Sequence, residues 1–86
     1  MKDTFTLDPD VEFRRLGERI VLVHLVTNEV FELNSTGARV WELLGESIPK
    51  GEIFERLTTE LEVGPEQLQH DVDNLLRELE SAGLIS

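Results

Sequence analysis

Two hydrophobic periods divide the chain near Asn34. Before this residue, apolar and polar positions alternate with a period of two, which is typical of β-strands with one buried face. After it, apolar positions recur every three or four residues, which is typical of helices packed on a core. The pattern therefore predicts a sheet followed by a helical layer.

The first part of the pattern predicts three strands joined by short turns, at residues 11–16, 19–25 and 29–33. Gly17-Glu18 marks the first turn. In the second turn, Asn28 can take the left-handed conformation that hairpins often require. Because the links are short, we expect an antiparallel meander whose third strand is an open edge.

The central strand is apolar on both of its faces. One face carries Ile20 and Leu22, and the other carries Val21, Val23 and Leu25. A single layer of helices covers only one face of a sheet, so the second face is expected to have another cover. The sequence leaves three alternatives for what buries this second face. They are the N-terminal arm through Phe5 and Leu7, a second copy of the chain in a homodimer, and a different partner.

The second part of the pattern predicts three helices. Asn34 is a preferred N-cap residue, proline is favoured in a first turn, and Gly83 can take the left-handed position that ends a helix. The fold class is therefore α+β, winged helix-turn-helix-like, in the order β-β-β-α-α-α. The predicted helices run from Asn34 to about Leu44 or Gly45, from near Pro49 to Val63-Gly64, and from Pro65 to residue 82.

Composition and charge narrow the class of protein. A chain of 86 residues suits one domain, which we take as residues 11–86 preceded by an arm of residues 1–10. The net charge of −10 repels phosphates and anionic lipids, so we expect no nucleic-acid and no membrane partner. The sequence also lacks cysteine, a signal peptide and a membrane span, and we expect a cytoplasmic protein.

Candidate catalytic and metal-binding residues are few. His24 and His70 are isolated, and we interpret them as a packed or hydrogen-bonded histidine and a solvated one. Asp8-x-Asp10 lacks the other ligands of a calcium loop. The sequence contains no phosphate-binding loop and no supported pair of nucleophile and base. We therefore expect no enzyme, no catalytic residue, no metal site and no cofactor.

The predicted architecture, a small sheet with three helices, also fits a winged-helix DNA-binding protein. In that case the polar side of the third helix would meet the DNA, and its acidic residues would repel the phosphates. Those residues are Glu66, Asp71, Asp73, Glu78 and Glu80, against the single Arg77. The basic group of Arg14, Arg15 and Arg19 is interpreted as solvated surface, with contact to an acidic partner as the alternative.

Short motifs along the chain match those of a known family in order and spacing. They are FELNSTGARVWELL at residues 31–44, Glu52-Ile53, DVDNLLREL at residues 71–79, and GLI at residues 83–85. On these motifs the chain resembles the PqqD-like family, whose members recognise leader peptides of ribosomally made, post-translationally modified peptides. It is most similar to the stand-alone members of lasso-peptide pathways. Asn28 and Ile48-Pro49 depart from the family pattern, at a hairpin glycine and a Thr-led helix start.

The resemblance implies a non-catalytic protein that binds the leader of a precursor peptide. The leader would add as a strand to residues 29–33, against the helix of residues 65–82, and would be presented to a modifying enzyme. In a lasso pathway that enzyme would be a transglutaminase-like cysteine protease. The alternative is a pyrroloquinoline quinone-type peptide chaperone that delivers a precursor to a radical enzyme.

The resemblance also implies which residues bind the peptide. They are Glu29, Val30, Phe31, Glu32, Leu33, Leu68, Asp71, Val72, Leu75 and Leu76. For most of the apolar helix residues, ordinary core packing is the competing interpretation. The acidic residues of the set favour a leader with Lys or Arg nearby.

Overall fold

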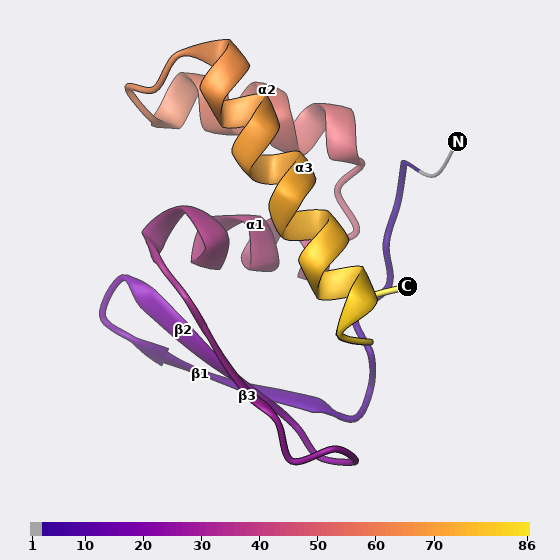
Figure 1. The fold of residues 1–86 in the computed structure, drawn as a ribbon. Helices are drawn as coiled ribbons and strands as arrows, with labels where there is room; N and C mark the ends of the chain where they lie inside the picture. The colour runs from indigo at the N-terminus through magenta and orange to yellow at the C-terminus, as the bar shows by residue number, and fades with distance from the viewer. Residues whose placement is uncertain (1–2) are drawn as a thin grey trace.

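The computed structural model describes residues 3–86 and has the predicted α+β order. The elements are β1 (Val11–Leu16), β2 (Arg19–His24), β3 (Val30–Leu33), α1 (Ser35–Gly45), α2 (Lys50–Glu60) and α3 (Pro65–Ser81). The helices lie together on one side of the sheet (Figure 1). All six predicted elements are confirmed, and their ends differ from the predicted ones by at most a few residues.

The sheet is an antiparallel meander with the strand order β1-β2-β3, so both β1 and β3 are edges. Its register places Phe13, Leu22 and Phe31 side by side on the face that meets the helices. Gly17 and Asn28 take positive φ angles of 66° and 63° in the two turns. The predicted turn conformation of Asn28 is therefore confirmed.

The backbone of β3 has an inner and an outer side. The N–H of His24 donates to the carbonyl of Glu29 over 2.9 Å, which is the first bond between β2 and the chain entering β3. Bonded pairs recur at every second residue of an antiparallel ladder. Phe31 therefore bonds to β2, whereas the N–H and C=O groups of Val30 and Glu32 point away from the sheet.

The same reasoning applies to β1. The N–H of Leu25 donates to the carbonyl of Asp10 over 2.8 Å, so the even-numbered residues of β1 bond to β2. The backbone groups of Val11, Phe13 and Arg15 consequently point to the outer side of β1. Both edges of the sheet thus carry backbone groups without a partner strand.

Helix α1 begins directly after β3 because Asn34 caps it. The side-chain Oδ1 of Asn34 accepts a hydrogen bond from the N–H of Gly37 over 2.9 Å, as the sequence predicted. A Cβ atom on Gly37 would lie only 3.3 Å from the Cβ of Leu33. The glycine therefore lets the first turn of α1 pack closely against the end of β3.

The end of α3 also follows the prediction. Gly83 takes a φ of 74°, its N–H donates to the carbonyl of Glu80, and the N–H of Leu84 donates to the carbonyl of Leu79. These two bonds form a Schellman motif. Leu84 is fully buried and packs back into the core.

Helix α2 differs slightly from the prediction. Pro49 is its N-cap residue and lies just outside the helix. At the other end the helix stops at Glu60, and Leu61 is already extended with φ −110° and ψ 144°. A helix that continued to Val63 would leave too little chain to reverse direction before α3 begins at Pro65.

The core lies between the inner face of the sheet and the three helices. Its buried members are Ile20, Leu22, Leu33, Ala38, Val40, Trp41, Leu43, Leu44, Ile53, Leu57, Leu68, Val72, Leu76, Leu79, Leu84 and Ile85. They come from β2, β3, all three helices and the C-terminal residues, so one core spans the described chain.

The N-terminal arm does not cover the outer face of the sheet, so one of the three covers that the sequence left open is excluded. Thr6 and Ser86 exchange backbone hydrogen bonds of 2.8 and 2.9 Å, and Leu7 pairs with Ile85 in an isolated bridge. The arm is held there because the C-terminal residues 84–86 offer it backbone partners. Among residues 3–86 nothing covers the outer face, where Val30 is 64% exposed.

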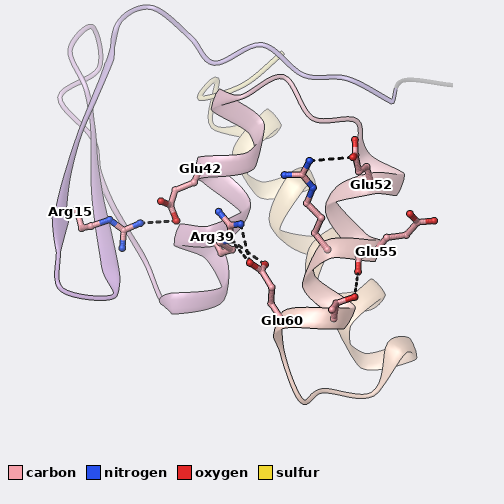
Figure 2. Close-up of polar contacts among 8 residues, drawn as sticks. Arg15, Arg39, Glu42, Glu52, Glu55 and Glu60 are labelled. Atoms are coloured by element: carbon pink, nitrogen blue, oxygen red, sulfur yellow. Dashed lines mark hydrogen bonds and ion pairs between the residues drawn. The ribbon is translucent and has the colours of Figure 1, made fainter.

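Ion pairs join β1 to α1 and α1 to α2 (Figure 2). Arg15 Nη2 lies 2.7 Å from Glu42 Oε1, and Arg39 Nη2 lies 2.9 Å from Glu60 Oε1. The hydrogen bond from Arg39 to Glu60 raises the pKa of the Arg39 guanidinium above its ordinary value. These partly exposed pairs link α1 to the sheet and to the end of α2.

Candidate functional site

A cavity of about 410 Å³ opens between the end of β3, the start of α1 and one face of α3. It is lined by Glu32, Leu33, Asn34, Thr36, Gly37, Asp71, Asn74, Leu75 and Glu78. Glu32 also belongs to the open edge of β3, so the cavity adjoins unpaired backbone groups. We call this cavity, together with the outer edge of residues 30–33, the β3–α3 groove.

The apolar part of the groove is formed by one residue from the sheet and one from the helix. Leu33 is buried at the end of β3, and Leu75 of α3 is half-buried against the core. Gly37 lies beside Leu33 and contributes no side chain. An apolar side chain entering the groove would therefore be desolvated by contact with both leucines.

The charged part of the groove is acidic. Glu32, Asp71 and Glu78 line it, and the lining includes no Lys or Arg. Glu32 pairs with Arg19 over 2.5 Å, whereas Asp71 accepts a hydrogen bond from the neutral Gln67 over 2.9 Å. Among residues 3–86 no Lys or Arg pairs with Asp71 or Glu78, so both carboxylates are available to a ligand.

Asn74 lies between Asp71 and Glu78 on α3, and both ends of its side-chain amide have a hydrogen-bond partner. Its Nδ2 lies 3.0 Å from His70 Nε2, and its Oδ1 accepts from Arg77 Nη1 over 3.2 Å. The guanidinium of Arg77 is thereby engaged by Asn74. It does not line the groove but another hollow, on a different side of α3.

The structure brings together part of the predicted set. Glu32, Leu33, Asp71 and Leu75 all line the cavity. Their positions come from two elements far apart in the sequence, and the gap between them is the groove. Which of these residues contact a peptide stays a prediction.

Other predicted residues lie along β3 but outside the cavity. Glu29 precedes β3 and accepts the hydrogen bond from His24. Val30 is on the uncovered face, with an outward backbone, and Phe31 is half-buried on the helix side. These residues can contribute through the backbone of the edge or beside it.

Three predicted helix residues belong to the core and do not line the groove. Leu68, Val72 and Leu76 are only 1%, 2% and 4% exposed. On α3 the groove residues Asp71, Leu75 and Glu78 each precede a core residue by one position, and one position corresponds to a rotation of about 100°. For these three residues, ordinary core packing is therefore the correct interpretation of their positions.

Five groove residues were missing from the predicted set: Asn34, Thr36, Gly37, Asn74 and Glu78. Two of them had a usable signal in the sequence. Asn74 and Glu78 follow Asp71 by three and seven positions, which places them on the same side of a helix. Thr36 and Gly37 reach the groove only because α1 starts beside α3, which no local pattern indicates.

The two histidines lie as the sequence suggested. His24 is buried, and its Nδ1 accepts a hydrogen bond from the N–H of Val26 over 3.2 Å, while His70 is exposed. Within residues 3–86 no group of three or more His, Cys, Asp or Glu side chains is placed to hold a metal ion. No helix in the same range is long and apolar enough to cross a membrane.

Comparison with known families gave one match to most of the chain. The sequence model described as "PqqD: Coenzyme PQQ synthesis protein D (PqqD)" matches residues 19–85. This range begins with β2 and includes both walls of the groove. A comparison with curated proteins found no match.

Comparison with solved structures found two similar chains. One is described as "TbiB1 in Complex with the TbiA(beta) Leader Peptide", with a TM-score of 0.86 and 29% identity over 100% of this chain and 95% of that chain. The other is described as "Lasso peptide synthetase B1 complexed with the leader peptide", with a TM-score of 0.85 and 24% identity over 95% and 96%. At this lower identity the second match supports the shared fold alone.

Proposed function

The chain belongs to the PqqD family, and on that premise we propose that it binds the leader of a ribosomal precursor peptide as a fourth strand on β3, against α3. One observation carries the proposal. The outward N–H and C=O groups of Val30 and Glu32 lie beside a cavity whose opposite wall is α3. A peptide in this position gains backbone partners from the strand and side-chain contacts from the helix.

The similar structures support a peptide as the ligand. The chain named TbiB1, which is 29% identical over the full length of this chain, was solved with a leader peptide. Backbone pairing contributes affinity with little dependence on sequence, and pockets for alternate side chains select the peptide. In this chain Leu33 and Leu75 offer such a pocket.

We further propose that the protein is non-catalytic and presents the leader to a modifying enzyme. Thr36 is the one hydroxyl-bearing residue among those that line the groove, and no histidine lines it. A hydroxyl without an adjacent base is a poor nucleophile. The enzyme would be the leader protease of a lasso-peptide pathway, as the resemblance of the sequence motifs to the stand-alone members of such pathways implies.

The proposal is tested with fluorescein-labelled peptides that correspond to the N-terminal segments of any short open reading frames found next to the chain's own gene. We expect saturable binding by fluorescence anisotropy. In amide hydrogen exchange followed by NMR, the N–H groups of Val30 and Glu32 exchange fast in the free protein and slowly with peptide. The N–H groups of Phe31 and Leu33 exchange slowly in both states, because they already bond to β2.

Two results would contradict the proposal. One is a folded protein that shows no saturable binding of the leader. The other is saturable binding that leaves the exchange of Val30 and Glu32 unchanged, which would move the peptide away from the β3 edge.

A further inference from the structure

The acidic wall of the β3–α3 groove has a regular arrangement. Asp71, Leu75 and Glu78 lie on one stripe of α3, on successive turns, because they are separated by four and three residues. Along the helix axis these separations correspond to about 6 Å and about 4.5 Å. An apolar side chain thus lies between two carboxylates.

A peptide strand that runs along α3 presents side chains to one face at a comparable, slightly longer interval. Alternate residues of a strand point the same way and lie about 6.6 Å apart. If one such residue packs on Leu75, its neighbours on the same face come near Asp71 and Glu78. Long Lys or Arg side chains can cover the remaining difference in spacing.

The electrostatics of the groove favour cations at these two positions. Asp71 and Glu78 have no Lys or Arg partner among residues 3–86, and the two nearby arginines bond to other side chains of the groove. Arg19 pairs with Glu32, and Arg77 donates to Asn74. The net charge of −10 adds to the same preference at long range.

We propose that the groove selects leader segments with two cationic side chains, Lys or Arg, on the strand face that meets α3, one on each side of an apolar residue packed on Leu75. Asp71 and Glu78 are the specificity-determining residues. This inference rests on the proposed function and adds the class of leader that the groove accepts.

The test uses mRNA display of random 15-residue peptides against the full chain. The wild type is compared with the double variant Asp71→Asn and Glu78→Gln. The matched control is Glu55→Gln with Glu62→Gln, which removes the same charge from exposed residues outside the groove. Circular dichroism checks that each variant is folded.

The wild type and the control are expected to enrich peptides with Lys or Arg at two alternate positions around an apolar residue. The groove variant is expected to keep the apolar position and lose the cations. For the peptide selected by the wild type, the groove variant should bind about fivefold to tenfold more weakly, as two partly exposed ion pairs are lost. That difference should shrink in high salt.

A charge exchange separates recognition from a structural effect. The variant Asp71→Lys with Glu78→Lys should bind the selected peptide more than tenfold more weakly. Binding should recover when the two cations of the peptide are replaced by Glu, because the pairs are restored with opposite sign.

The outcomes separate the two proposals. Enrichment of no peptide by the wild type would overturn both. Enrichment of peptides without flanking cations, an equal loss in the control, or no recovery after the charge exchange would overturn the cation selection alone.

Discussion

The edges of β1 and β3 both point unpaired backbone groups outward, but they meet the helices differently. Beside β1, a hollow of about 280 Å³ is lined by residues that include Arg15, Arg39, Glu42 and Glu60, and these pair with one another (Figure 2). Beside β3, Asp71 and Glu78 line a larger cavity without a cationic partner from residues 3–86. These four charged residues beside β1 are paired within the chain, whereas Asp71 and Glu78 beside β3 are open to a ligand.

The side chains of β1 also oppose strand addition. Glu12, Arg14 and Arg15 are exposed on this strand, and charged side chains on an edge discourage pairing with other chains. Phe13 is 57% exposed and packs edge-on against Trp41, with 6.1 Å between the ring centroids. On the proposed function, an open edge is therefore insufficient for a peptide site, because the peptide's side chains also need a second wall to contact.

The largest expected effect comes from proline on each edge. Val30→Pro and Phe13→Pro each remove an outward N–H group without breaking a bond to β2. We expect Val30→Pro to weaken leader binding more than tenfold and Phe13→Pro to change it less than twofold, measured by fluorescence anisotropy. Phe13→Ala controls for the loss of the ring. An equal loss of leader affinity in the two proline variants would show that the peptide does not prefer the β3 edge to the β1 edge.

A smaller effect is expected from two neighbouring leucines of α3. Leu75→Ala removes a groove contact and should weaken leader binding by about tenfold, with a small change in stability. Leu76→Ala leaves a cavity in the core and should lower the free energy of unfolding by about 2–4 kcal/mol. Urea unfolding measures the loss of stability, and a titration of each folded variant with labelled leader measures the loss of affinity.

The pattern would reverse if α3 were rotated relative to the sheet. In that case Leu76→Ala would weaken binding by the folded protein, and Leu75→Ala would affect mainly its stability. Either result would place the groove on a different stripe of the helix.

The smallest effect is expected at the ion pair beside β1. A double-mutant cycle with Arg39→Gln and Glu60→Gln should give a coupling of about 0.2–1 kcal/mol that decreases with salt, because both side chains are partly exposed. Since the pKa of Arg39 is raised, its contribution would be lost only in strongly alkaline solution, so the coupling should be constant across neutral pH. Leader affinity should not change. A measurable loss of leader affinity would connect the β1 side to the groove.

Much of the fold could be predicted because its signals are local. The Asn34 cap, the left-handed Asn28 and the glycine that ends α3 all appear where the sequence indicated. Each depends on the hydrogen bonds or backbone angles of a few adjacent residues. The exit from α2 was predicted three residues too late, because it depends on the path that the chain takes to α3.

The candidate site was predictable only in part. The open edge of β3 followed from strand order, and Asp71 and Leu75, which the resemblance implied as peptide-binding, line the cavity beside it. The arm could not be placed, because Phe5 and Leu7 suit any apolar surface and their path depends on backbone partners at the other end of the chain. The C-terminal residues offered those partners.

The sequence by itself determined the order of the elements, the faces of the strands and the start of α1, because each follows from hydrophobic period and local hydrogen bonding. The tertiary structure alone decided that Leu75 lines the groove while Leu76 lies in the core. Both leucines belong to one broad apolar stripe. Their burial depends on the rotation of α3 about its own axis, which packing against the sheet and the other helices sets.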